Sequence, residues 1–237
     1  MQTLKRRLIN LLCATMSLFL LGNPSFSETN ASEQAMPRVK VVEELYQAGS
    51  GLPVGKILSV RENAVIFHRD PAVGYRAKTG LPLYEGDTIS TRNKARILCR
   101  LIDGSQFTLA PESTLSILKS SYNFTGETGI LSLFLKQGNA RFQIRRPTEF
   151  SALDFKVKTE AILAAANDAG FVIRISEDRT DITAFVDSRL EVTRIANPQD
   201  VVFLSDLQRL VVTNDAGFSK LVNRLRISDQ ESFVEAC

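Results

Sequence analysis

Side chains that could carry out acid–base or nucleophilic chemistry are few in this sequence and widely spaced. His68 is the one imidazole among 237 residues. It follows the apolar run Ile66-Phe67 and precedes Arg69-Asp70-Pro71, which predicts a histidine at the end of a strand or in a turn. Proton transfer would also need a nucleophile and an orienting group, and we expect no pocket that gathers His68 with carboxylates.

The residue patterns of familiar catalytic and cofactor sites do not occur. The sequence contains no G-x-S-x-G, H-E-x-x-H, C-x-x-C or phosphate-loop pattern. A single histidine also excludes a metal site built from several imidazoles. We therefore predict that the protein is not an enzyme and carries no cofactor and no resident metal.

Two pairs of acidic residue and glycine could be taken for fragments of a calcium site. Gly86-Asp87 and Asp103-Gly104-Ser105 put a carboxylate in a turn, and hard cations bind carboxylates. Both lack the ligand density of a calcium loop. Turn formation explains them better, because Asp caps its own turn and Gly adopts a positive φ at little steric cost. We predict that these residues and Gly80 form structural turns.

Five basic residues form a possible contact strip for an anionic partner such as a glycan or a lipid head group. They are Arg141, Arg145, Arg146, Lys156 and Lys158. Most of them alternate with apolar residues, as on the solvated outer face of a strand. We favour that structural interpretation over a binding strip.

The N-terminal residues have the composition of an export signal. Lys5, Arg6 and Arg7 precede the apolar stretch 8–21, and a break at residues 22–24 is followed by Ser25 and Ser27 at the −3 and −1 positions of a cleavage site. An uncleaved anchor is the alternative, but fourteen residues are fewer than the ~20 that span a membrane. We predict a signal peptide over residues 1–27, cleavage after Ser27, and a periplasmic or otherwise exported protein that is not integral to the membrane.

The charge of the mature chain argues against binding to nucleic acid. Without the three N-terminal cations, 26 basic residues face 26 acidic ones. A phosphate-binding surface needs an excess of Lys and Arg on one face.

After export and cleavage, Cys99 and Cys237 would remain in a compartment that permits disulfides. A bridge between them is possible, and a buried, inert Cys99 is favoured.

Beyond a polar leader at residues 28–37, the apolar residues recur with a period of two. Ala95, Ile97, Cys99 and Leu101 alternate with Arg96, Leu98 and Arg100, which is typical of a half-buried strand. A three-residue loop at 102–104 with a left-handed Gly104 pairs Cys99 with Phe107, and keeps four apolar residues on one face. We predict a bulged hairpin here.

The same alternation predicts a second hairpin and several short strands after it. Apolar residues alternate over 131–135 and 140–144, and Gln137-Gly138-Asn139 between them is interpreted as the turn. Short strands follow near residues 155–157, 171–175, 182–186, 190–192, 201–204 and 210–212. The pattern predicts an all-β fold of short antiparallel strands, forming either a sandwich or roll or a solenoid-like body. The predicted β domain covers residues 38–212, and a tail with a short C-terminal helix covers 213–237.

Several short motifs follow one another along the chain: Gly74 to Leu83, Gly86 to Ile89, and Leu101 to Ser105 with Phe107, Leu109 and Ala110 after it, continued by Phe155 to Thr159 and Thr183 to Val192. In these motifs the chain resembles the FecR domain family of bacterial periplasmic proteins over about residues 55–212. The resemblance implies a secreted, non-catalytic β domain. The family's namesake is a signal relay with a cytoplasmic segment, for which the seven residues before the apolar stretch would be too short.

One stretch departs from the family pattern. Asn167 and Asp168 stand where similar proteins have Arg and Gly, and Ala164, Ala165 and Ala166 replace β-branched residues. Because alanine favours helix over strand, the pattern leaves the geometry of residues 160–170 open.

Three classes of function are compatible with these features. A non-catalytic module that binds or scaffolds another envelope protein, through strand edges or loops, is favoured. A sensory partner in cell-surface signalling is the alternative, and an envelope hydrolase is the least favoured.

Overall fold

The computed structural model describes residues 40–43, 45–69, 73–123, 125, 128–145, 152–213 and 217–224. Every regular element in these ranges is a β-strand, which confirms the all-β prediction. The predicted signal peptide and leader, residues 1–37, lie outside the described residues.

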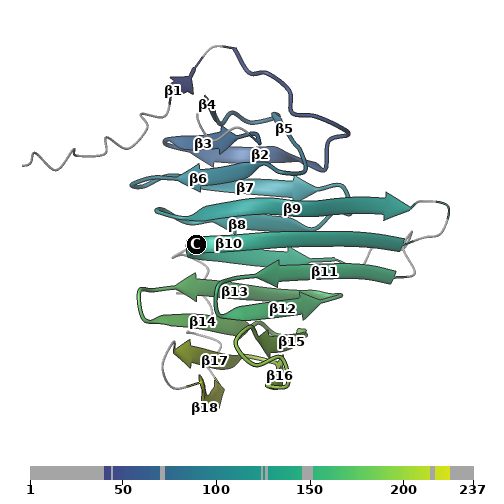
Figure 1. The fold of residues 1–237 in the computed structure, drawn as a ribbon, viewed down its shortest axis with the longest axis vertical. Coiled ribbons are helices and arrows are strands. Elements are labelled where there is room, and N and C mark those ends of the chain that lie inside the picture. Colours follow the sequence, from purple (N-terminus) through teal and green to yellow (C-terminus); the bar gives the residue numbers. More distant parts are fainter. Residues whose placement is uncertain are drawn as a thin grey trace, which may run out of the picture. The chain divides into compact units, whose positions relative to one another are not determined.

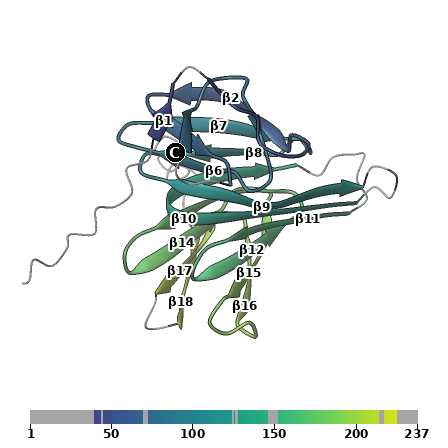
Figure 2. The same ribbon diagram turned by 45° about the horizontal axis from the view of Figure 1, so that its top comes forward.

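The strands form two layers that share one long strand, β10 (Thr128–Ile144) (Figures 1 and 2). Layer A contains the first half of β10 and, in order of pairing, β1 (Lys40–Val42), β4 (Val73–Arg76), β3 (Ala64–Phe67), β6 (Thr88–Thr91), β9 (Thr114–Asn123), β11 (Ala152–Lys158), β12 (Ile162–Ala166), β15 (Arg189–Arg194) and β16 (Val201–Ser205). Layer B contains the second half of β10 and β5 (Pro82–Leu83), β2 (Gly55–Arg61), β7 (Arg96–Leu101), β8 (Gln106–Leu109), β13 (Ala169–Ile175), β14 (Arg179–Ala184), β17 (Gln208–Thr213) and β18 (Gly217–Arg224).

After β10 the chain adds strands alternately to the two layers: β11 and β12 to layer A, β13 and β14 to layer B, β15 and β16 to A, and β17 and β18 to B. Most neighbours are antiparallel as predicted, but β1 with β4 and β10 with β11 are parallel. The fold therefore combines a two-layered sandwich with the progressive winding of a solenoid.

The core lies between the layers and is built from the inward-facing residues of both. Phe142 of layer B is stacked on Phe171 with ring centroids 5.0 Å apart, and its ring lies 6.5 Å from that of Phe155 in layer A. All three side chains are fully buried. The alternation of apolar and polar residues in the sequence thus places one face of each strand in a common interior.

The bulged hairpin at Asp103-Gly104 is confirmed in register. Cys99 pairs with Phe107 and Ile97 with Leu109. Gly104 has a φ of 84° and donates its N–H to the carbonyl of Leu101 at 3.0 Å.

The second predicted hairpin is wrong, because residues 128–144 form one continuous strand. Gly138 has a φ of 83°, and there β10 passes from layer A to layer B instead of reversing. Buried Ser113 holds this bend: its Oγ accepts the N–H of Asn139 at 2.9 Å and donates to the Asn139 carbonyl at 3.0 Å. A glycine with positive φ in a polar stretch is common to a turn and to such a bend, so the local sequence does not separate them.

Two further segments are strands: one is predicted from the sequence to begin a helical tail, and the sequence pattern leaves the geometry of the other open. The start of the predicted helical tail is a strand, since Gly217–Arg224 forms β18 beside β17; residues 225–237 lie outside the described residues. The alanine-rich stretch is also a strand, β12, in which Ala164 and Ala166 face the core and Ala165 faces outward. Pairing with β11 and β15 outweighs the helical preference of alanine here.

Candidate functional site

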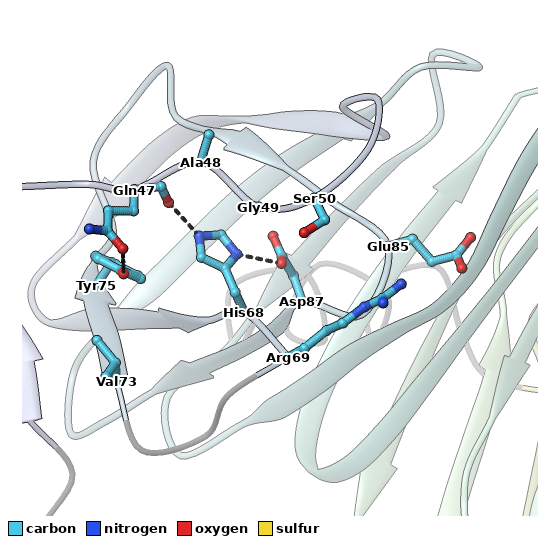
Figure 3. Close-up of a pocket in the computed structure, with 10 residues that line it drawn as sticks. All are labelled: Gln47, Ala48, Gly49, Ser50, His68, Arg69, Val73, Tyr75, Glu85 and Asp87. Carbon is cyan, nitrogen blue, oxygen red and sulfur yellow. Dashed lines mark hydrogen bonds and ion pairs between the residues drawn. The ribbon is translucent and has the colours of Figure 1, made fainter.

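His68 lies in a small cavity of about 290 Å³ where three segments meet (Figure 3). The imidazole follows β3, and Asp87 directly precedes β6 in the turn 84–87. Because Phe67 pairs with Thr88 in the antiparallel β3–β6 ladder, His68 and Asp87 occupy the next register position. The third segment is residues 45–54, which we call the strap.

Both ring nitrogens of His68 have partners. Nδ1 lies 2.6 Å from Oδ1 of Asp87, and Nε2 lies 2.8 Å from the backbone carbonyl of Gln47. A carbonyl only accepts, so Nε2 must carry a proton. One further proton then lies between Nδ1 and the Asp87 carboxyl, either on the ring or on the acid. The pair is therefore an imidazolium with a carboxylate, or a neutral imidazole that accepts from a carboxylic acid.

The strap is held by more than the imidazole. The Tyr75 hydroxyl donates to Oε1 of Gln47 at 3.1 Å, and the Tyr46 hydroxyl donates to the Pro82 carbonyl at 2.7 Å. Gly49 passes so close to the Tyr84 ring that an added Cβ would lie 2.6 Å from it. Rings of Tyr46, Tyr75 and Tyr84 surround His68 with centroids 5.2–5.9 Å away.

Burial sets the electrostatics of this cavity. Asp87 has a side chain only 1% exposed, and this burial raises the pKa of its carboxyl. Hydrogen bonds from His68 and from the Tyr84 N–H, which lies 2.8 Å from Oδ2, oppose the rise. The pKa of Tyr46 is also raised, first by burial and then by the nearby Asp87.

The expectation that no pocket gathers His68 with carboxylates is wrong, since Asp87 and Glu85 both line the cavity. The prediction failed because the residues that meet here are far apart in the sequence: Gln47 and Asp87 are 21 and 19 residues from His68. The register of β3 against β6 brings His68 and Asp87 together. To use this signal, one must know that these two strands pair, and not only where each strand lies in the sequence. The Gln47 carbonyl occupies Nε2, however, so accepting a proton from a nucleophile would require the strap to release the ring.

The predicted turn residues have geometries that stabilise turns. Gly80 and Gly86 have φ values of 89°. Asp103 accepts the N–H of Ser105 through Oδ1 at 3.0 Å and the Ser105 hydroxyl through Oδ2 at 2.8 Å. Asp87 caps its own turn through the Tyr84 N–H and also binds His68.

The described members of the basic strip lie in different layers. Arg141 is on the layer B half of β10 and Arg145 directly follows that strand, whereas Lys156 and Lys158 are on β11 in layer A. Their neighbours Phe142 and Phe155 face each other across the core, so the two pairs point outward on opposite faces. Arg141 lies over the Phe185 ring, 5.3 Å from its centroid. Arg146 lies outside the described residues.

Among the described residues, no strand pairs with the second edge of β16, which we call the open edge and which the sequence pattern did not single out. Strand β16 ends the order of layer A, and its ladder partner is β15 (Figure 2). Phe203 in its centre is 73% exposed. The strand, Val-Val-Phe-Leu-Ser, contains no charged residue and no proline that would block its edge. Two other terminal strands contain a charged residue or a proline, Lys40 in β1 and Pro82 in β5. Charges and prolines at an edge prevent pairing with other chains.

The backbone groups of that edge can be assigned from the ladder. Arg194 donates its N–H to the Asp200 carbonyl at 3.0 Å, so residues 194 and 200 face each other as a hydrogen-bonded pair. Hydrogen-bonded and non-bonded pairs alternate in antiparallel strands, which makes Glu191 with Phe203 a non-bonded pair. The N–H and carbonyl of Phe203 therefore point away from β15. Ser205 agrees, since its N–H goes to Oε1 of Gln208 at 2.8 Å.

Cys99 is a free thiol that is fully buried, and burial raises its pKa. Cys237 lies outside the described residues. Within the described ranges, no three His, Cys, Asp or Glu side chains gather closely enough to hold a metal ion. That part of the chain also contains no helix with the length and apolarity to cross a membrane.

Comparison with known proteins gives one family. Residues 87–186 match the model of the family described as FecR protein, so the resemblance seen in the sequence is confirmed over this segment. No curated protein matches the chain significantly. Two solved structures of a protein described as a putative anti-sigma factor from Parabacteroides distasonis are similar, at 19% and 18% identity and a TM-score of 0.43 each. Each match covers 55% of this chain and 56% of that one.

Proposed function

From the FecR domain at residues 87–186 and the open edge of β16, we propose that this chain is a non-catalytic module of the bacterial cell envelope that takes part in signalling by binding another protein. The proposal includes export by the predicted signal peptide. The observation that carries it is the exposed Phe203 at the centre of an unprotected strand edge.

An open edge carries a risk of unwanted association, and a binding function offsets that risk. An exposed edge with apolar side chains promotes unwanted association, and proteins generally block it. The same edge can bind an extended segment of a partner, whose main chain pairs with the free N–H and C=O groups. The ionisable cluster around His68 is used within the protein and holds the strap.

A photoreactive phenylalanine analogue placed at position 203 of the full chain tests this function in cells. We expect a discrete protein adduct from position 203, because the analogue lies where a partner strand would pair. The matched control is position 118. Leu118 lies on β9 of the same layer and is 48% exposed, but β9 is not a terminal strand, because it pairs with β10 along its length and with β6 over residues 114–116.

Three results would contradict the proposal. Equal adducts from positions 203 and 118 would indicate chance collisions. Adducts with lipid or glycan alone would move the function to surface binding. No adduct from position 203 under conditions in which the chain is exported would remove the edge from consideration.

A further inference from the structure

A groove on the outer face of layer A lies directly beside the open edge. It has a volume of about 1160 Å³ and is lined by residues of β11, β12, β15 and β16 and by the turns at 167–168, 187–188 and 206. Pockets for small molecules are usually ~300–1,000 Å³, so this groove exceeds the size of a typical small-ligand site. Its open form suits a longer, extended ligand.

The floor of the groove comes from strand register. Lys156, Ala165, Glu191 and Phe203 form one row across the four strands, because 156 pairs with 165, 165 with 191, and 191 with 203. Ala165 has the smallest side chain of the row and lies in its middle. The alanine stretch that departs from the family pattern therefore lowers the floor between the larger neighbours.

The lining is acidic. Five carboxylates line the groove, against two basic side chains, Lys156 and Arg189; the carboxylates are Asp154, Asp168, Asp187, Glu191 and Asp206. Lys156 is also paired with Asp154 at 2.7 Å. Asp206 accepts the N–H of Asp187 at 3.0 Å, which holds two of the acidic turns side by side. A positively charged ligand complements this surface.

We propose that the partner contributes an extended, basic segment that adds a strand to the open edge of β16 and places lysine or arginine side chains toward the groove. This inference rests on the proposed function and names the chemistry of the partner. The main chain of the segment would pair with the free groups of Phe203 and Val201, and one face of its side chains would contact the Phe203 ring. Glu191 and Asp206, which also line the groove, would favour positively charged side chains of the segment.

A second copy of this chain fits the edge less well. Antiparallel pairing of β16 with its own copy would bring two acidic grooves side by side, and like charges at an interface oppose association. Burial of two Phe203 rings would be gained, but no basic surface would face the carboxylates.

The test uses the full chain and a fluorescent peptide of alternating lysine and valine, with a glutamate–valine peptide of the same length as the control. We expect the basic peptide to bind by fluorescence anisotropy, with an affinity that falls as salt rises, and the acidic peptide not to bind. Phe203→Ser and Glu191→Lys should each weaken binding at least tenfold. Leu118→Ser, the same kind of change on a non-edge strand, should leave it unchanged.

Strand addition is tested separately from charge attraction. A basic peptide that is N-methylated along one edge cannot donate its N–H groups there, and we expect it to bind at least tenfold more weakly. Equal binding of the methylated peptide, or equal binding of the basic peptide to wild-type and Glu191→Lys protein, would overturn the proposal.

Other outcomes separate this inference from the function on which it rests. A protein adduct from position 203 together with no binding of the basic peptide would keep the function and overturn the partner chemistry. Absence of both would overturn both. Dimerisation of the chain by sedimentation equilibrium that Phe203→Ser abolishes would assign the edge to a second copy, and would also overturn the inference.

Discussion

In the region around β3–β6 the polar side chains bind one another inside the protein, whereas in the region around β15–β16 side chains remain exposed to solvent. In the first, His68, Asp87, Gln47 and Tyr75 are hydrogen-bonded to one another and hold the strap in place. In the second, the Phe203 ring is exposed and five carboxylates line an open groove. Both regions are built from the same strand alternation. A cluster of ionisable residues can therefore serve stability, and the apolar strand edge is then the better candidate for function.

The largest effect is expected where the two layers join. Gly138→Ala should lower the free energy of unfolding by about 3 kcal/mol, because the residue needs a positive φ and its new Cβ would overlap Ser113 and approach the Glu112 carbonyl to 2.6 Å. Gly104→Ala is the matched control: it has a φ of 84° but open space around it, so about 1 kcal/mol is expected. Urea unfolding measures both. Equal losses would mean that the bend does not depend on this close contact.

The next effect concerns the His68 cluster. Asp87→Ala should lower the free energy of unfolding by roughly 2–3 kcal/mol, since it removes a turn cap and leaves Nδ1 of the partly buried His68 ring unpaired. Asp87→Asn should lose less, because its carbonyl can still accept from the Tyr84 N–H and its amide can donate to Nδ1 of a neutral ring. If alanine and asparagine cost the same, the hydrogen bonds of Asp87 are not what stabilises the strap.

A smaller effect is expected from pH at the Asp103 turn. Burial raises the pKa of Asp103 above its ordinary value of 3.8, so the folded chain keeps this proton at pH values where the unfolded chain has lost it. Its contribution to stability therefore increases as pH falls through the folded pKa, and is complete below about 3.8. Asp103→Asn has no such titration.

The measurement is urea unfolding of wild-type and Asp103→Asn protein from pH 7.5 to 4. Relative to the variant, the wild type should become more stable toward the acid end. A difference that moves the other way would mean that the ionised carboxylate is the stabilising form. Asp87 has a raised pKa from the same cause and is present in both proteins, so its effect cancels in the comparison.

Much of the fold could be predicted because local chemistry determines it. Alternating apolar residues predict the strands. The three-residue loop that ends at Gly104 then fixes the register of the hairpin, in which Cys99 pairs with Phe107. The bend at Gly138 could not be predicted, because a hairpin and a layer crossing need the same glycine, and Ser113 decides between them from 26 residues away. The His68 pair and the open edge of β16 also depend on which strands are neighbours. Period-two patterns identify strands, but they do not state which strand lies last in a layer.

On this interpretation the His68 cluster stabilises the protein and the β16 edge binds its partner. The direct test introduces His68→Gln and Phe203→Ser separately, and measures for each the urea unfolding and the yield of protein adduct from a photoreactive group at Val201, on the same edge. We predict that His68→Gln lowers the free energy of unfolding by about 2 kcal/mol with the adduct unchanged. Phe203→Ser should abolish the adduct with a change in stability within about 0.5 kcal/mol. Loss of the adduct in folded His68→Gln protein, with the adduct retained in Phe203→Ser, would contradict the account.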